Sequence, residues 1–187
     1  PRALGPQNPP PVAGLAGSGA AEARWRGAYG TLGNTQVESR FADHRPYIYE
    51  GKEVDQPTHL GFDLASTQQA PVTASNKGVV VHAAYLGIYG NCVVVDHGLG
   101  VQSLYAHLST IDVKDGDAIE KGQTLGRSGT TGLAGGDHLH FTMLVGGVQV
   151  NPVEFWDGHW MEDRVFRKIR EAGGPGPGGA TEGPGSP

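Results

Sequence analysis

Cysteine is almost absent from this sequence: the single Cys92 rules out an internal disulfide framework and is interpreted as a small buried residue. Basic residues are also few. With 14 Lys and Arg against 19 Asp and Glu, the net charge of -5 argues against a nucleic-acid partner. No apolar run approaches the roughly 18 residues that a membrane-spanning helix requires. We therefore expect the 187 residues to form one domain with tails, and we predict a monomer.

The two ends of the chain contain little that could be buried. Residues 1–24 are rich in Pro, Gly and Ala, and residues 171–187 are rich in Gly and Pro. Both are predicted to be disordered segments flanking a folded domain over residues 25–170. Because the chain begins with Pro1 and not Met, we expect a fragment or a processed product whose export signal lies outside it.

The pattern inside the domain predicts an all-β fold. Short β-branched runs such as GVVVHAAYLG and GNCVVVDHG are bounded by glycine. The stretch HLHFTMLVGGVQVNP predicts a hairpin that turns at Gly146 and Gly147. Only MEDRVFRKIREA, residues 161–172, has the spacing of a helix, so a short C-terminal helix is expected.

Two histidines stand two residues apart in GGDHLHFTM, residues 135–143. Alternate residues of a strand face the same side, about 6.6 Å apart, so His138 and His140 can project into one cleft. Both could bind a metal, or one could bind it while the other stands beside it. Taken alone, a His-x-His pair in a strand is more often structural than a metal site.

A second motif, THLGFDLAS, strengthens the metal interpretation. His59 and Asp63 would lie about 13 Å apart in a straight strand, so they can share an ion only if the chain bends, which Gly61 permits. With His140 they make two imidazoles and one carboxylate, the kind of three-ligand set that leaves a catalytic zinc one free position. The alternative is a solvated His59 with Asp63 capping a turn.

The stretch LYAHLS places His107 after Tyr105 on an apolar strand. A lone histidine in that context is more often a satisfied core or edge residue. Next to a metal centre, His107 would instead act as a general base or donate a hydrogen bond to a developing oxyanion.

Together these motifs resemble the lysostaphin/LytM-type zinc metallopeptidases of the M23 family. The similarity runs from about Phe41 to Trp156. It is carried by His59-x-x-x-Asp63 and by the stretches NCVVVDHGLGVQSLYAHLS, VKDGDAIEKGQTLGRSGTTG, GDHLHF and VNP. The fold that this resemblance implies is a compact, mainly antiparallel β domain with an open groove that holds one Zn²⁺.

The resemblance also implies roles for individual residues. His59, Asp63 and His140 match the three zinc ligands of the family. His138 matches the catalytic histidine next to the metal, and His107 matches the second catalytic histidine. The family's usual substrates are peptide stems and cross-bridges of bacterial peptidoglycan.

One residue departs from the family pattern. Asp137 stands where the family often has Pro, as in GPHLHF, which could alter the rim of the groove without disturbing the ligands. The chain is thus predicted to be an extracytoplasmic zinc metalloendopeptidase of peptidoglycan. The stretch FADHRPYIYEGKEVDQPTHLGFDLAS resembles members from bacteria with thin walls and favours D,D-endopeptidase action. The sequence leaves open which of His107 and His138 moves the proton.

Two alternatives belong to other functional classes. Some relatives lack zinc ligands and act as cell-wall modules that activate another hydrolase, whereas this chain keeps the ligands. The stretch VKDGDAIEKGQTLG also resembles the hairpin of biotinyl or lipoyl carrier domains. Lys114 and Lys121 lack the expected Met or Ala neighbours, and a carrier would leave His59, Asp63 and His140 unexplained.

Overall fold

A computed structural model describes residues 20–33, 35–44, 47–50, 52–55 and 58–174. Most of the predicted N-terminal linker and all but four residues of the predicted C-terminal tail lie outside the described residues. The strands are β1 (Gln36–Ser39), β2 (Tyr47–Tyr49), β3 (Lys52–Asp55), β4 (Phe62–Ala65), β5 (Pro71–Thr73), β6 (Gly78–Tyr85), β7 (Asn91–Gly98), β8 (Val101–Leu108), β9 (Thr110–Ile111), β10 (Ala118–Ile119), β11 (Thr124–Arg127), β12 (Leu139–Val145) and β13 (Val148–Val150).

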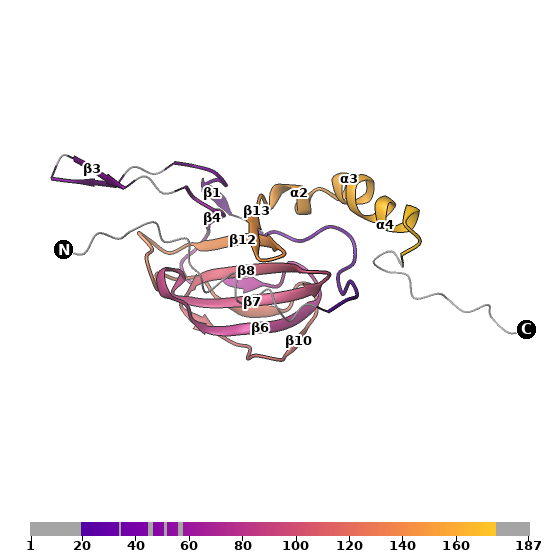
Figure 1. The fold of residues 1–187 in the computed structure, drawn as a ribbon. Helices are drawn as coiled ribbons and strands as arrows, with labels where there is room; N and C mark the ends of the chain where they lie inside the picture. The colour runs from indigo at the N-terminus through magenta and orange to yellow at the C-terminus, as the bar shows by residue number, and fades with distance from the viewer. Residues whose placement is uncertain (1–19, 34, 45–46, 51, 56–57, 175–187) are drawn as a thin grey trace, which may run out of the picture.

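The strands form one large antiparallel sheet in the order β1-β4-β12-β8-β7-β6-β10, with β13 paired to β12 (Figure 1). A three-stranded sheet, β5-β11-β9, and the β2-β3 hairpin complete the strand pairing. Every pair is antiparallel, which confirms the predicted all-β class. The predicted hairpin is also confirmed: β12 and β13 turn at Gly146 and Gly147, both with positive φ.

The central strands β7 and β8 are covered on both faces, and nearly every residue in them is buried. Val93, Val95 and Tyr105 point into the main core. The alternate residues Val94 and Leu104 belong to a second apolar cluster on the opposite face. Burial on both faces explains the nearly continuous apolar runs in this part of the sequence.

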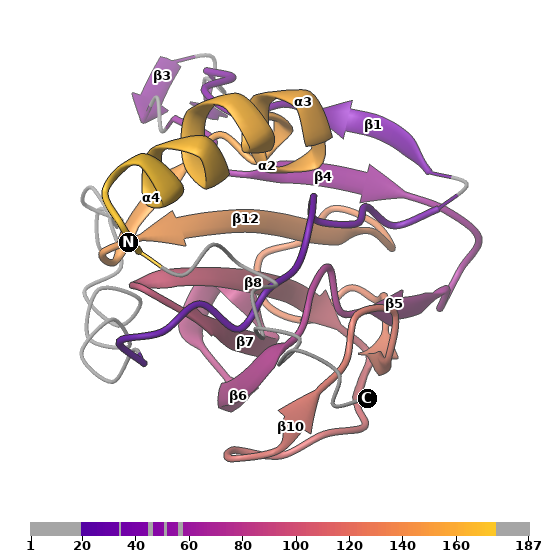
Figure 2. The same ribbon diagram turned by 90° about the vertical axis from the view of Figure 1, so that its right-hand side faces the viewer.

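The C-terminal helices cover the β4-β12 end of the large sheet (Figure 2). They are α2 (Val153–Trp156), α3 (Gly158–Met161), the π-helical turn η3 (Glu162–Phe166) and α4 (Arg167–Glu171). Asp157 caps α3 by accepting hydrogen bonds from the amides of His159 and Trp160. The predicted C-terminal helix over residues 161–172 is confirmed by η3 and α4. The Trp156 ring stacks on Phe141 at 5.7 Å, which anchors α2 to β12.

A segment before β1 crosses the core face of the sheet. The Ala20 carbonyl accepts from the Leu99 amide at 2.7 Å, and the Arg24 amide donates to the His97 carbonyl at 2.7 Å. Trp25 and Tyr29 are buried in the main core. Contacts with the folded body therefore begin by Ala20, five residues before the predicted start of the domain, while the division into three segments stays a prediction.

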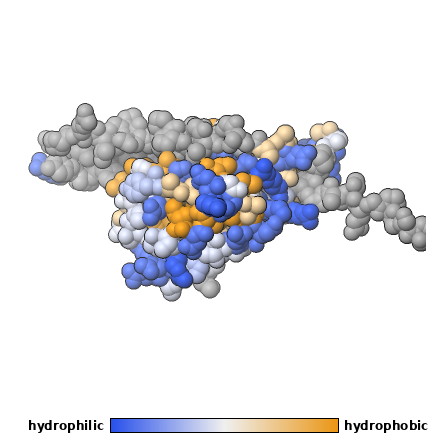
Figure 3. Space-filling view, turned by 90° about the horizontal axis from the view of Figure 1, so that it is seen from below, coloured by the Kyte–Doolittle hydropathy of each residue, from blue (hydrophilic) through white to orange (hydrophobic). Residues whose placement is uncertain are grey.

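No helix among the described residues is long and apolar enough to cross a membrane. On the face seen from below Figure 1, apolar residues gather at the centre and hydrophilic residues surround them (Figure 3).

Lys121, one of the two lysines of the carrier alternative, donates to the Ala28 carbonyl at 2.7 Å and does not stand free at a hairpin tip.

Candidate metal centre

A row of paired residues crosses four strands of the large sheet and forms the centre of the site. Ser39 of β1 pairs with Asp63 of β4, Asp63 pairs with His140 of β12, and His140 pairs with Ala106 of β8. Directly paired residues point to the same face of an antiparallel sheet. The register therefore brings Asp63 and His140 together across 77 residues of sequence.

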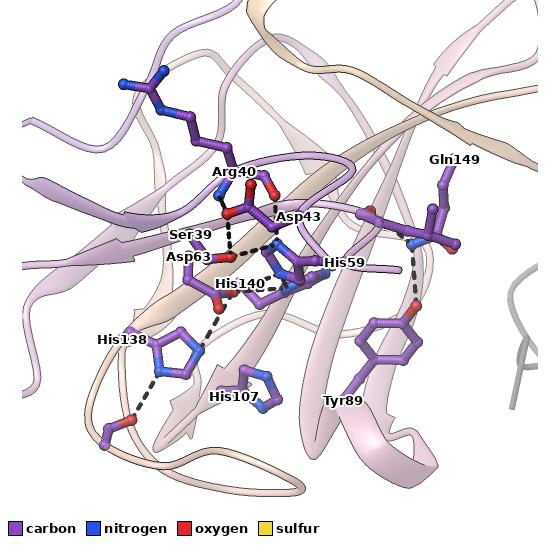
Figure 4. Close-up of polar contacts among 12 residues, drawn as sticks. Ser39, Arg40, Asp43, His59, Asp63, Tyr89, His107, His138, His140 and Gln149 are labelled. Carbon is purple, nitrogen blue, oxygen red and sulfur yellow. Dashed lines mark hydrogen bonds and ion pairs between the residues drawn. The ribbon is translucent and has the colours of Figure 1, made fainter. Parts of the chain in front are cut away.

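His59, Asp63 and His140 converge as the metal interpretation predicts (Figure 4). Oδ1 of Asp63 lies 3.0 Å from Nε2 of His59 and 3.0 Å from Nδ1 of His140. The two nitrogens are 3.1 Å apart. Tetrahedral ligands at about 2.1 Å from a zinc ion would be separated by about 3.4 Å, so the three atoms need only small shifts to hold one.

The hydrogen bonds of His59 favour a cation in this cluster. Its Nδ1 lies 2.9 Å from the Arg40 carbonyl oxygen, which can only accept, so Nδ1 carries the proton. In the neutral ring Nε2 then presents a lone pair toward the carboxylate of Asp63. Two imidazoles and one carboxylate directed at a common point fit a divalent zinc ion.

Gly61 separates the two ligands of the first motif, and the chain bends at this residue before β4 begins. A Cβ atom there would lie 2.6 Å from Cε1 of His140 and 2.8 Å from the Phe141 carbonyl oxygen. Its φ is not in the left-handed region, so backbone strain does not explain the glycine. Glycine is thus required for space against His140 as well as for the predicted bend.

A turn after β1 contacts Nδ1 of His59, the ring nitrogen that does not face Asp63. This turn was not anticipated from the sequence. Oγ of Ser39 lies 3.1 Å from Nδ1 of His59 and donates to the Asp43 carboxylate at 3.0 Å. The same carboxylate accepts from the Arg40 amide at 2.7 Å, and Ala42 within the turn has a φ of 68°. Partners of this kind fix the orientation and tautomer of a ligand histidine. The only signal in the sequence is Ser39 and Asp43 at the spacing of a turn.

His138 stands beside the three ligands on the same face. Its Nδ1 donates to the Gly136 carbonyl at 2.9 Å, and its Nε2 lies 3.5 Å from Oδ1 of Asp63. The backbone amide of His138 donates to Gly129 at 3.2 Å, which ties the residue to the loop before it. The predicted common orientation of His138 and His140 is therefore confirmed.

His107 reaches the site through a break in strand alternation. Regular alternation would point it to the core face with Tyr105, but the β7-β8 register shifts between Asn91 and Val93, which gives β8 one extra residue. His107 has a φ of 61°, and its ring lies 4.9 Å from the His138 ring. This bulge turns the imidazole toward the metal face. Strained backbone of this kind is concentrated at functional sites.

The main chain also sets the tautomer of His107. Nδ1 lies 2.8 Å from the Thr131 carbonyl oxygen, so it carries the proton and Nε2 keeps a lone pair. Thr131 is anchored by its own hydroxyl, which donates to Leu108 at 2.8 Å. Thr131 was not identified from the sequence, where its position beside two glycines in SGTTG marks only a tight turn.

The pKa values in the cluster differ because burial and charge act in different proportions. Burial alone would raise the pKa of Asp63, but contacts with three imidazoles hold it well below its usual range. Burial lowers the pKa of His107 to about 4, so this ring is neutral at pH 7. For His138 burial is outweighed by Asp63 and the Gly136 carbonyl, and the pKa is raised.

Tyr89 closes the opposite side of the site, next to His140. Its ring lies 5.6 Å from the His140 ring, and its hydroxyl accepts from Nε2 of Gln149 at 3.1 Å. Gln149 also donates to the Leu60 carbonyl at 3.1 Å, one residue after His59. This network joins the two ligand-bearing segments, and neither Tyr89 nor Gln149 was identified from the sequence.

His97 and Cys92 are structural residues. His97 is fully buried on the core face, with Nδ1 at 2.7 Å from the Lys77 carbonyl and Nε2 at 2.8 Å from Oγ of Ser103. Cys92 is fully buried, as predicted, and burial raises the pKa of its thiol above the usual range. Neither belongs to the metal cluster of the described residues.

Comparison with known proteins gives relatives that include peptidoglycan peptidases and a stage II sporulation protein of Bacillus subtilis. The chain is 42% identical over 95 residues to the DD-carboxypeptidase/endopeptidase Mpg of Neisseria meningitidis, an alignment covering 51% of this chain and 22% of Mpg. It is 42% identical over 96 residues to the peptidoglycan DD-endopeptidase ShyA of Vibrio cholerae, again covering 51% and 22%. The chain therefore spans only 22% of the length of these curated relatives.

Solved structures share the fold. A zinc-containing peptidase from Vibrio cholerae is 31% identical with a TM-score of 0.60, over 68% of this chain and 40% of that one. The catalytic domain of lysostaphin from Staphylococcus simulans is 28% identical with a TM-score of 0.56, over 66% and 92%. Residues 57–152, which carry all five predicted site residues, match the family model for peptidase family M23. On this match, the chain belongs to peptidase family M23.

Proposed function

We propose that this chain is a zinc metalloendopeptidase that hydrolyses peptide cross-links of bacterial peptidoglycan, with D,D-endopeptidase specificity. The observation that carries the proposal is the convergence of His59, Asp63 and His140 with two further imidazoles on one face of the sheet. The names of the relatives Mpg and ShyA support the substrate class. Because peptidoglycan lies outside the cytoplasm, the proposed location is extracytoplasmic.

His59, Asp63 and His140 would hold the zinc ion through Nε2, Oδ1 and Nδ1, the atoms that face one another. A zinc ion held there supplies a Lewis acid that polarises a peptide carbonyl and lowers the pKa of water. The chain's own contribution is to fix the three ligand atoms. The Arg40 carbonyl and Ser39 hydroxyl orient His59, while strand pairing orients Asp63 and His140.

His107 is proposed to take the proton from the attacking water. Its Nδ1–H is committed to the Thr131 carbonyl, so Nε2 has the lone pair that a general base requires. Its position on the bulge of β8, with its ring 4.9 Å from that of His138 and 5.8 Å from that of His140, supports this role. The same imidazole, once protonated, can deliver its proton to the leaving amine.

His138 is proposed to stabilise the tetrahedral intermediate. Its ring is fixed by the Nδ1–H bond to Gly136, and Nε2 is within 3.5 Å of the Asp63 carboxylate oxygen. With a proton on each ring nitrogen, His138 can donate a hydrogen bond from Nε2 to the oxyanion that forms on the scissile carbonyl. The two histidines thus divide the work of a base and an oxyanion donor.

The alternative is a non-enzymatic cell-wall module that activates another hydrolase. Such a module has no need for a complete ligand set, two additional imidazoles with fixed tautomers and a strained His107. These features favour the enzyme. Zinc binding together with peptide-bond cleavage by the isolated chain would separate the two interpretations.

The test is digestion of purified, cross-linked peptidoglycan by the zinc-loaded chain, with and without a metal chelator, followed by mass spectrometry of the fragments. Chelator-sensitive release of uncross-linked peptides with new D-alanine carboxyl termini is the expected result. The matched control is Asp63→Asn, which keeps the shape of the ligand and removes its charge. Stoichiometric zinc binding without cleavage would contradict the proposal that the chain is an enzyme, and it would support the activating module.

A further inference from the structure

Asp137, the residue that departs from the family pattern, makes two hydrogen bonds that a proline could not make. Its Oδ1 accepts from the Ser128 hydroxyl at 2.6 Å, and its Oδ2 accepts from the Gln69 amide at 3.0 Å. One carboxylate therefore joins two segments that are far apart in the sequence. Hydrogen bonds to a charged acceptor are about twice as strong as neutral ones.

The segments joined by Asp137 are the turn after β4 and the end of β11. The Ser128 hydroxyl also accepts from the Ala70 amide at 3.0 Å, and the Ser128 amide donates to the Ala70 carbonyl at 2.9 Å. Arg127 donates to the Gln69 carbonyl at 3.0 Å. Gln69 has a φ of 54°, an uncommon conformation for this residue type that these bonds help to hold. We call Gln69, Ser128 and Asp137 the rim clasp.

One member of the rim clasp, Asp137, lies directly before His138 in the chain. The carbonyl that orients the His138 ring belongs to Gly136, and the carbonyl that accepts from its amide belongs to Gly129. A Cβ atom added at Gly135 or Gly136 would meet no heavy atom within 4 Å, so packing does not restrain this part of the loop. Asp137 is the one side chain between the orienting carbonyl and the oriented ring.

We infer that Asp137 is a positioning residue that holds His138 in place through the rim clasp. This inference rests on the proposed function, in which His138 donates to the oxyanion. Proline at this position would restrict the chain by fixing φ. Asp137 instead restrains the loop with its two hydrogen bonds to Ser128 and Gln69. The restraint that proline would give through a fixed φ is therefore replaced by hydrogen bonding.

The test compares Asp137→Ala, Asp137→Pro and Ser128→Ala in the full zinc-loaded chain, on purified cross-linked peptidoglycan fragments. Asp137→Ala should lower kcat about tenfold with little change in KM or in zinc content, since a small misplacement of a catalytic group has effects of this size. Asp137→Pro should recover most of the loss. Ser128→Ala should have a smaller effect that is not additive with Asp137→Ala.

Two readouts do not depend on activity. In Asp137→Ala the Gln69 amide should exchange with solvent about tenfold faster, and the Nδ1–H signal of His138 in the NMR spectrum should broaden or disappear. The control Asp115→Ala removes an exposed carboxylate in the turn before β10 and should change none of these quantities.

The outcomes separate the inference from the proposed function. If the wild-type chain cuts no peptidoglycan, the proposed function fails, and the His138 ring signal still decides the inference. An unchanged ring signal in Asp137→Ala, or wild-type kcat with a faster Gln69 amide, would show that the clasp does not position His138. Loss of zinc in Asp137→Ala would also overturn it, because the effect would then act on the ligands.

Discussion

His140 and His97 lie on opposite faces of the same sheet, both buried, and they differ in their partners. Nδ1 of His140 faces the Asp63 carboxylate at 3.0 Å and Nε2 of His59 at 3.1 Å. His97 has one neutral partner for each ring nitrogen: Nδ1 donates to the Lys77 carbonyl, and Nε2 lies 2.8 Å from Oγ of Ser103. The first arrangement leaves lone pairs facing one another, whereas the second gives each ring nitrogen one neutral hydrogen-bonding partner.

The comparison shows what distinguishes a metal-binding histidine from a structural one. Burial does not, since both rings have almost no exposed surface. The distinction lies in whether the protein itself satisfies the ring nitrogens. Around His97 the hydrogen-bond chain continues through Ser103 to Tyr105 and Ser75 and is complete. Around His140, Nδ1 faces the other two candidate ligand atoms, and a cation among them would satisfy all three.

The largest expected difference between the two faces is in zinc content and activity when His140 or His97 is replaced. His140→Ala should abolish stoichiometric zinc binding and lower peptidase activity more than about a thousandfold, about 4 kcal/mol in barrier height. His97→Gln should keep its zinc and lower only the thermal midpoint. Zinc content by atomic emission, with activity on cross-linked peptidoglycan, checks both. Zinc retained by His140→Ala would contradict the assigned ligand set.

The next effect is the pH dependence of stability that His97 should cause. Burial lowers its folded pKa from 6.5 to about 4, so the unfolded chain binds the proton first as pH falls. This stabilisation is complete above pH 6.5 and is lost toward pH 4, by up to about 3 kcal/mol. Urea unfolding between pH 7 and pH 4 measures it. His97→Gln should flatten the slope, and an unchanged slope would show that His97 does not contribute.

The proposed base is tested by His107→Asn and His107→Ala, of which asparagine better tolerates the positive φ of 61°. Both should lose about a hundredfold in kcat, about 2.7 kcal/mol, while zinc content stays at one ion. Parallel measurement of the thermal midpoint controls for backbone strain. If His107→Asn were fully active, the imidazole would have no chemical role.

The smallest expected effect compares two serines that each lie next to a histidine ring nitrogen. Ser39→Ala should weaken zinc affinity about tenfold, because it removes a partner that orients His59. Ser103→Ala, on the other face, should lower stability by about 1 kcal/mol and leave zinc affinity unchanged. Competition with a chromophoric chelator measures the affinities. Equal effects of the two substitutions on zinc affinity would contradict the distinction between a metal-binding face and a structural face.

The ligand set could be predicted from the sequence because its members are strong local signals. His138 and His140 face one side because strand alternation requires it, and the bend at Gly61 was expected from the spacing of His59 and Asp63. The sequence did not reveal that Gly61 also makes room for His140, a contact between distant parts of the chain. The contact of Ser39 with His59 and the link from Tyr89 to Gln149 were also missed, because each joins segments that are far apart in the sequence.

Residue type, strand periodicity and motif order are local properties. They predicted the β architecture, and the resemblance that the motifs carry predicted the family and the five candidate site residues. Where those residues point depends on the folded chain. Alternation would place His107 beside Tyr105 in the core, and the bulge in β8 brings it to the metal face instead. The register across β1, β4, β12 and β8 likewise brings Ser39, Asp63 and His140 into one row. A register is set by the packing of whole strands, so no short motif can specify it.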